Sequence, residues 1–188
     1  MTNPTFTIYT GPMFGSKTTR LLGEIDRLKY RGRTVLAVKP KIDTRYSEDK
    51  ISSHNGGTVT AISIQNAHEL YDHIGDSSYW STIAVDEAFM IENIDEVLIH
   101  YFRKGISIIV SSIQLDAEEK PFESIKNMMP WATNIEVCPA VCTKCDQDAY
   151  YTEALFDIKN SSQEERVGSD NMYAPRCANH YTTFKVEK

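Results

Sequence analysis

The sequence has no excess of basic residues. Its 20 lysines and arginines are outnumbered by 26 aspartates and glutamates, so the formal net charge is −6 and the isoelectric point is about 5.4. A general nucleic-acid-binding protein needs a basic face for the phosphate backbone, so this class of function is disfavoured. Small nucleotides remain possible ligands.

A long apolar run is also lacking. No window approaches the roughly 20 apolar residues that a membrane-spanning helix needs. The opening residues, Met1 to Thr7, do not form a basic segment followed by an apolar one. We therefore expect a cytoplasmic protein without a membrane partner, whose four cysteines stay reduced and available to a metal.

Internal repeats and low-complexity tracts are absent too, and 188 residues suffice for one main core with a small appendage. The first half alternates short apolar runs rich in β-branched residues with segments of helical spacing. This alternation predicts an α/β fold, a parallel sheet flanked by helices. The expected strands are 6–10, 34–38, 82–85 and 106–110, and the expected helical segments are 21–28, 70–74 and 94–102. Residues 43–60 show no apolar period, so we expect a mobile excursion there.

A near match to a phosphate-binding loop joins the first expected strand to the first expected helix. In such loops backbone N–H groups and a helix N-terminus surround the phosphates, a lysine offsets their charge and a hydroxyl binds Mg²⁺. An ordinary turn with a surface lysine is the alternative. The candidate ATP-binding residues are Gly11, Pro12, Met13, Phe14, Gly15, Ser16, Lys17 and Thr18.

Ser16 departs from this pattern, which has glycine before the lysine. If that position needs a positive φ, a side chain there costs on the order of 1 kcal/mol. Either Ser16 is strained, or Gly15 has taken over as the flexible point of the loop. We favour the second interpretation.

Two adjacent carboxylates, Asp86 and Glu87, directly follow the apolar run 82–85. Carboxylates at the carboxyl end of a parallel strand point into the crevice where open α/β sheets bind ligands. One acid can hold Mg²⁺ through water, and the other can act as a base. A solvated turn is the common alternative, but the phosphate-loop pattern favours a functional pair.

Four metal-ligating residues form two pairs, Cys142 with Cys145 and Cys177 with His180, each separated by two residues. Thiolate and imidazole suit the zinc ion, and four such ligands with no open position are typical of a structural site. Four unrelated residues are the alternative, but this paired spacing is uncommon by chance. Cys138 lies outside the pattern, and we expect it to be a small buried residue.

In combination, these motifs resemble those of the zinc-containing, cytosolic (type II) thymidine kinase family. The resemblance covers nearly the whole chain in the family's order. The matching segments are Gly11–Phe14, Lys17–Thr18, Asp43–Ser47, Ser53–Gly56, Val85–Glu87, Lys120–Phe122 and the two Cys/His pairs. It implies a phosphate-loop nucleoside-triphosphatase-like kinase domain over 1–137 and a small zinc-binding lasso domain over 138–188.

The resemblance further implies transfer of the γ-phosphate of ATP to the 5′-hydroxyl of thymidine, with Mg²⁺ accompanying ATP, a structural Zn²⁺ and a homotetramer. Glu87 matches the family's catalytic base and Asp86 its magnesium-side acid. Thr18 matches a second magnesium ligand, and Lys17 matches the phosphate-binding lysine.

Other positions carry over with a supporting role. By resemblance Asp43 and Arg45 support the reacting phosphate, although from the residues alone a surface ion pair is the alternative. For the apolar members of the nucleoside-binding set, core packing is the alternative. That set is Met13, Met90, Ile113, Phe122, Thr152 and Tyr173.

Three further departures affect the expected nucleoside pocket. Phe89 stands where the family has glutamine, and Met90 and Ala117 stand at aromatic positions. Each missing aromatic pair removes on the order of 1 kcal/mol, which would weaken or broaden base recognition. The alternative function is a nucleotide-binding relative with weak or no kinase activity and a regulatory role. An ATPase acting on macromolecules is a weaker third reading, because the acidic chain has no basic stripe.

Overall fold

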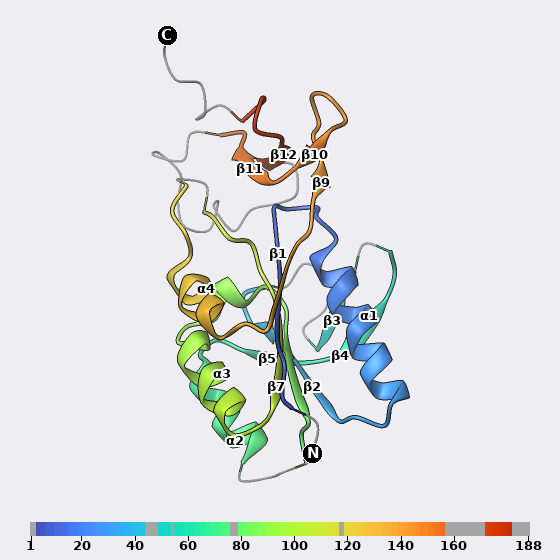
Figure 1. The fold of residues 1–188 in the computed structure, drawn as a ribbon, viewed down its shortest axis with the longest axis vertical. Helices are drawn as coiled ribbons and strands as arrows, with labels where there is room; N and C mark the ends of the chain where they lie inside the picture. The colour runs from blue at the N-terminus through green and yellow to red at the C-terminus, as the bar shows by residue number, and fades with distance from the viewer. Residues whose placement is uncertain are drawn as a thin grey trace.

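The computed structural model describes residues 3–43, 49–53, 55–75, 79–116, 119–156 and 172–181. At its centre lies a sheet of six parallel strands in the order β5-β2-β6-β7-β1-β8. The strands are β1 Phe6–Thr10, β2 Val35–Pro40, β5 Ile62–Ile64, β6 Thr82–Val85, β7 Ser107–Ser111 and β8 Asn134–Val137. Because they run in one direction, their carboxyl ends lie along one edge, at the top of the sheet in Figure 1.

Helices cover both faces of this sheet. They are α1 Lys17–Tyr30, α2 Leu70–Ile74, α3 Ile94–Arg103 and α4 Glu123–Met128, with 3₁₀ turns η1 Ala67–Glu69, η2 Ala88–Met90 and η3 Met129–Trp131. One face carries α1 together with a short antiparallel hairpin, β3 Lys50–Ser52 and β4 Thr58–Thr60. The opposite face carries α2, α3 and α4, so the molecule has three layers (Figure 1).

Alternate side chains of the central strands pack on opposite faces. In β6, Ile83 and Val85 join the core under α2, α3 and α4, whereas Ala84 joins the core under α1. In β7, Ile108 and Ile109 divide in the same way. This is the two-residue period of a β-strand. Since helices cover both faces, both sets of positions are apolar, which explains the continuous apolar runs in the sequence.

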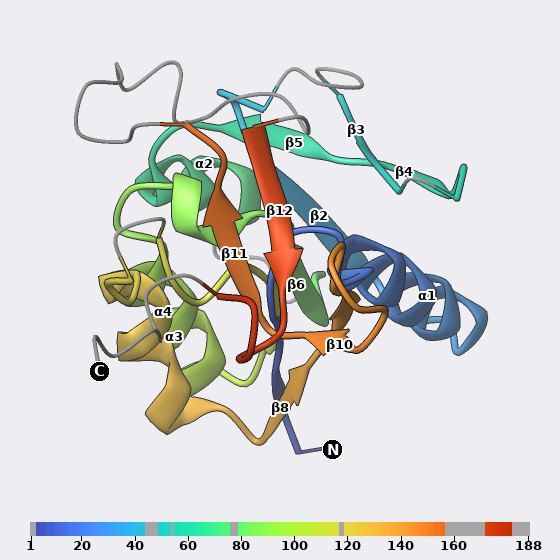
Figure 2. The same cartoon turned by 90° about the horizontal axis from the view of Figure 1, so that it is seen from above.

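The C-terminal part lies across the carboxyl ends of the strands. It consists of two antiparallel pairs, β9 with β10 and β11 with β12. Their bounds are β9 Ala140–Val141, β10 Asp148–Ala149, β11 Tyr151–Ala154 and β12 Tyr173–Arg176. Seen from above, β11 and β12 lie over the sheet, on the side where the phosphate loop leaves β1 (Figure 2).

The structure confirms the α/β fold class and the parallel sheet, with small shifts in the bounds. Two strands of the central sheet, β5 and β8, are not predicted from the sequence, because β5 has only three residues and β8 is an edge strand with mostly exposed side chains. The expectation of a mobile excursion over 43–60 is wrong for the described residues of that stretch, which include the hairpin of β3 and β4. Ile51 in β3 and Val59 in β4 are buried in the core under α1. Strands of three residues are too short to show a period in the sequence.

None of the helices in the described ranges is long and apolar enough to cross a bilayer.

Candidate active site and metal centre

The loop between β1 and α1 packs closely against the main chain at Cys138. Gly11 has a φ of 137°, and a Cβ added to it would overlap the carbonyl oxygen of Cys138. A Cβ on Gly15 would lie 2.5 Å from the same oxygen. Cys138 is fixed because its N–H donates to the carbonyl of Thr10 at 2.7 Å, and its side chain is buried, as expected. Only glycine permits such a close backbone approach.

Ser16 adopts a left-handed backbone conformation, with φ of 57° and ψ of 25°, directly before α1. Phe14 is also left-handed, with φ of 65°, whereas Gly15 is not. The interpretation that Gly15 has become the flexible point of the loop is therefore wrong. Gly15 is needed for the space that it leaves to Cys138, and the strain of a left-handed side chain, roughly 1–2 kcal/mol, stays on Ser16.

Lys17 begins α1 and is 7% exposed. Its Nζ donates to the carbonyl oxygen of Pro12 at 2.6 Å, and the N–H of Gly15 donates to the same oxygen at 3.3 Å. A buried ammonium requires such an acceptor. The loop therefore holds a positive charge beside the N-terminus of α1, where the helix dipole also favours an anion.

Asp86 lies at the carboxyl end of β6 and is buried. The hydroxyl of Thr18 donates to its two carboxylate oxygens at 3.0 and 3.1 Å, and the hydroxyl of Ser111 donates to Oδ1 at 2.6 Å. Burial, followed by repulsion from Glu87, raises the pKa of Asp86 to about 7 in spite of these donors and of Lys17. A cation beside it would favour the ionised form.

Glu87 follows at a left-handed φ of 47° and is half-buried. Its carbonyl accepts the N–H of Met90 at 3.0 Å, which closes the turn η2. A left-handed glutamate costs free energy that the surroundings must offset, and such backbone strain clusters at ligand sites. The predicted pair of carboxylates thus lies at the end of β6, and Asp86 accepts hydrogen bonds from Thr18 in the first turn of α1.

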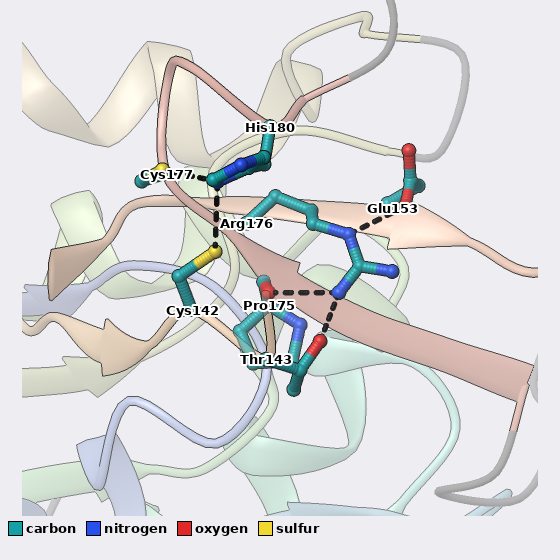
Figure 3. Close-up of polar contacts among 7 residues, drawn as sticks. All are labelled: Cys142, Thr143, Glu153, Pro175, Arg176, Cys177 and His180. Carbon is teal, nitrogen blue, oxygen red and sulfur yellow. Dashed lines mark hydrogen bonds and ion pairs between the residues drawn. The ribbon is translucent and has the colours of Figure 1, made fainter. Parts of the chain in front are cut away.

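The four predicted metal ligands come together between β9 and the residues after β12. The ligand atoms of Cys142, Cys145, Cys177 and His180 all lie within 4.8 Å of one another. Cys177 Sγ is 3.4 Å and Cys142 Sγ is 3.8 Å from Nδ1 of His180 (Figure 3). The sulfurs of Cys145 and Cys177 are 3.6 Å apart. Three thiols and one imidazole are a donor set that fits structural zinc.

Local hydrogen bonds favour the thiolate form of one ligand. Burial raises the pKa of Cys142, but backbone N–H groups of Cys177 and Lys144 and the neighbouring thiols of Cys145 and Cys177 outweigh it and lower the pKa to about 6. Since zinc binds thiolates rather than thiols, this shift favours cation binding at Cys142.

Comparison with known families agrees with this geometry. The thymidine kinase family model matches residues 5–181, which is most of the chain. The chain belongs to the thymidine kinase family. Membership supports a nucleoside kinase activity and implies ATP and thymidine as substrates.

Within this thymidine kinase family member, three of the predicted nucleoside-binding residues lie together. The N–H of Met13 donates to the hydroxyl of Thr152 at 3.0 Å, so the phosphate loop touches β11. Thr152 and Ile113 also line a small cavity of about 10 Å³. The other residues that line it are Gly11, Pro12, Gln114, Leu115, Tyr150 and Tyr151.

Two of the other predicted nucleoside-binding residues, Phe122 and Tyr173, contact aromatic neighbours. Phe122 packs against Phe89 with ring centroids 4.6 Å apart, and Tyr173 packs edge-on against Phe156 at 5.5 Å. Met90 is half-buried in η2. The aromatic residue at the family's glutamine position therefore makes an apolar contact with a residue of the predicted pocket.

The predicted phosphate-supporting residues are only partly described. Asp43 is half-buried beyond β2, and its N–H donates to the carbonyl of Pro40 at 3.1 Å. Arg45 lies outside the described residues, as does Ala117.

Sequence reasoning missed several residues that shape the site. Ser111 is the last residue of β7, just as Asp86 directly follows β6, so a polar residue after the apolar run 108–110 was the available signal. Gln114 accepts the hydroxyl of Thr10 at 3.1 Å and donates to the carbonyl of Tyr150 at 3.4 Å, and nothing in its sequence context indicates this bridge.

Proposed function

We propose that the protein transfers the γ-phosphate of ATP to the 5′-hydroxyl of thymidine, giving thymidine 5′-monophosphate and ADP. One observation carries this proposal: the hydroxyl of Thr18 meets the carboxylate of Asp86 at 3.0 Å, between the phosphate loop and the end of β6, with Glu87 next in the chain. Phosphoryl-transfer enzymes use this combination of loop lysine, hydroxyl and acid. Family membership supports a nucleoside as the acceptor.

Thr18 and Asp86 are suited to hold Mg²⁺ with ATP, because both offer the hard oxygen atoms that this ion prefers. Bound there, the ion would supply positive charge that offsets the negative charge on the transferred phosphoryl group. Lys17 adds a positive charge on the side of the loop, and the N-terminus of α1 offers backbone N–H groups to the phosphates. Asp43 and Arg45 support the reacting phosphate, as the resemblance implies.

Glu87 acts as the general base in this mechanism. Its carboxylate takes the proton of the 5′-hydroxyl while the bond from O5′ to the γ-phosphorus forms. The bond from that phosphorus to the bridging oxygen breaks, and ADP leaves with the electron pair. Asp86 is unsuited to the base's role, because Thr18 and Ser111 already donate to its carboxylate.

The nucleoside set contributes binding rather than chemistry. We assign contacts with the nucleoside to Met13, Met90, Ile113, Phe122, Thr152 and Tyr173. Because Phe89 packs on Phe122, the nucleobase of the substrate faces an apolar ring. The amide of a glutamine at position 89 would instead offer hydrogen bonds. A hydrophobic pocket discriminates less strongly between bases than a hydrogen-bonding one, so acceptance of further deoxynucleosides is part of the proposal.

The remaining parts of the proposal concern organisation. The Cys142, Cys145, Cys177 and His180 cluster holds a structural zinc ion. Residues 1–137 form the kinase domain and 138–188 the zinc-binding domain, a division supported by the end of β8 at Val137. The family resemblance implies a homotetramer in the cytoplasm, and sedimentation of the purified protein tests the tetramer.

The direct test uses purified protein, γ-labelled ATP and each natural deoxynucleoside in turn. We expect label in thymidine 5′-monophosphate, with smaller amounts of other monophosphates. Labelled inorganic phosphate without any nucleotide product would contradict the proposal.

A nucleotide-binding relative with weak or no kinase activity is the second candidate. One contact favours it: Lys17 Nζ is bonded to the carbonyl of Pro12 in its own loop, so binding a phosphate requires the ammonium to exchange or share that acceptor. ATP binding measured by calorimetry, without transfer to any nucleoside, would select this function.

A further inference from the structure

Arg176 is the last residue of β12 and directly precedes the predicted zinc ligand Cys177. Its side chain is 6% exposed. Nε donates to a carboxylate oxygen of Glu153 at 2.6 Å, and Nη1 donates to the hydroxyl of Thr143 and, at 3.3 Å, to the carbonyl of Pro175 (Figure 3). One guanidinium therefore joins β11, the segment between Cys142 and Cys145, and the chain that enters the second pair of ligands.

Glu153 places this contact next to the phosphate loop. Glu153 follows Thr152 in β11. The hydroxyl of Thr152 accepts a hydrogen bond from the N–H of Met13 at 3.0 Å. Successive side chains of a strand point to opposite sides, so Thr152 can face the loop while Glu153 faces Arg176. An unbroken series of contacts thus runs from the metal cluster through Arg176 and β11 to the amide of Met13.

The chemistry of this contact requires arginine. A guanidinium offers donors in a fixed planar fork, and Arg176 uses two of its nitrogens in different directions. A lysine could bond Glu153 but has no rigid second arm for Thr143. Burial of such an ion pair contributes little to stability by itself, since desolvation offsets the attraction. Its defined effect is to fix one arrangement of the groups that it joins.

We propose that Arg176 is a positioning residue that couples the Cys142, Cys145, Cys177 and His180 cluster to the phosphate loop. Arg176 holds Glu153, Glu153 sets the position of β11, and Thr152 in β11 holds the amide of Met13. The kinetic consequence, tighter nucleoside binding, rests on the function proposed above. The structural consequence, protection of the Met13 amide, does not depend on any activity.

The first experiment measures hydrogen exchange of a peptide containing Met13 in the zinc-loaded protein and in Glu153→Gln, Arg176→Met and Thr143→Val. Arg27→Met is the matched control, because Arg27 forms an exposed ion pair with Glu24 on α1. We expect exchange at Met13 to rise roughly three- to tenfold in Glu153→Gln and Arg176→Met, less in Thr143→Val and not in Arg27→Met. Zinc content should stay at one ion per chain.

Chelation of zinc from the wild-type protein should raise exchange at Met13 as well. In Arg176→Met the same treatment should add little, because both changes break the same series of contacts and their effects are not additive. Unchanged exchange at Met13 in Glu153→Gln and Arg176→Met would overturn the proposal. An equal rise in β6 and β7, or zinc loss in Glu153→Gln, would also overturn it, since Arg176 would then only support overall stability or metal retention.

The kinetic experiment compares the same variants. In Glu153→Gln and Arg176→Met we expect the KM for thymidine to rise roughly three- to tenfold with kcat within about twofold. Arg176→Lys should show a smaller rise, because it keeps only the contact with Glu153. A fall in kcat at unchanged KM would contradict positioning of the nucleoside. Absence of transfer in the wild-type protein would refute the proposed function alone, since the exchange result is read without turnover.

Discussion

The sheet and the metal-binding part of this molecule are held together by different forces. Around the sheet, two apolar clusters fill both faces with isoleucine, leucine, valine and aromatic side chains. Among the described residues of the metal-binding part, the buried apolar cluster consists of Ala140, Cys142, Ala149 and Cys177, with Cys145 packed against it. Hydrophobic burial can fold the first part, whereas we expect the second to depend on metal–ligand bonds. The hydroxyl of Thr152 that touches the phosphate loop therefore belongs to the less self-sufficient part.

Loss of the metal should produce the largest difference in stability between the two parts. Zinc in small structural sites contributes on the order of 10 kcal/mol or more to folding. For Cys177→Ser we expect no zinc by elemental analysis and rapid proteolysis within 138–188, with the sheet still protected. The control is Cys138→Ser, which should keep one zinc per chain because Cys138 packs in the core under α1. Equal zinc content in both variants would contradict the ligand assignment.

Glu87→Gln tests whether Glu87, at the carboxyl end of β6, is the general base. An amide is nearly isosteric but cannot accept the proton of the 5′-hydroxyl, so we expect kcat to fall about a hundredfold to ten-thousandfold. ATP binding and the melting temperature should be retained, which calorimetry measures. Undiminished transfer by this variant would rule out Glu87 as the base.

The buried carboxyl of Asp86 predicts a pH dependence of stability on the sheet side of the molecule. Its pKa of about 7 lies above the ordinary value of 3.8, so the folded protein binds more protons than the unfolded chain between these values. The contribution of Asp86 to stability therefore falls as pH rises from about 4 to about 7, by up to roughly 1.4 kcal/mol per pH unit, and then levels off.

Denaturant unfolding of the wild-type protein and Asp86→Asn across this pH range provides the measurement. The free energy of unfolding of Asp86→Asn minus that of the wild type should increase with pH up to about 7. A difference that stays flat with pH would show that Asp86 is already ionised throughout. Added Mg²⁺ with ATP should reduce the dependence, because a bound cation favours the ionised form.

The smallest effects concern the two neighbouring positions of the phosphate loop. Gly15→Ala would place a Cβ 2.5 Å from the Cys138 carbonyl and 3.2 Å from that of Pro12, so the backbone must move. We expect a loss of ATP affinity of about tenfold or more, as overpacking costs roughly 1–3 kcal/mol. Ser16→Gly should instead tighten ATP binding several-fold, because it relieves roughly 1 kcal/mol of left-handed strain. Equal tolerance of both substitutions in ATP-binding measurements would contradict this view of the loop.

Those features of the molecule that depend on short-range sequence patterns were predictable. The spacing of Cys142, Cys145, Cys177 and His180 indicated a common site, and the structure brings their ligand atoms together. The alternation of apolar runs and helical segments indicated the parallel sheet. The residues that form one strand or helix are close in sequence, and so are the two ligands of each metal-binding pair.

Features that depend on distant contacts were not predictable. The role of Gly15 was misjudged because the carbonyl that excludes a side chain there belongs to Cys138, more than a hundred residues later. The pairing of β8 with β1 is equally remote. Arg176 and Glu153 show no local pattern that distinguishes them from surface charges, and only the packing of β11 on β12 buries them together.

The main-chain contact at Cys138 has a consequence for which sequence changes this chain can accept. The phosphate loop meets the carbonyl oxygen of Cys138, not its sulfur, so the position should accept other small residues freely. A single-residue insertion or deletion between Val137 and Pro139 would displace that oxygen from both glycines. We therefore expect this junction to tolerate substitutions but not insertions or deletions. This holds although the side chain of Cys138 is one of the most deeply buried in the core under α1.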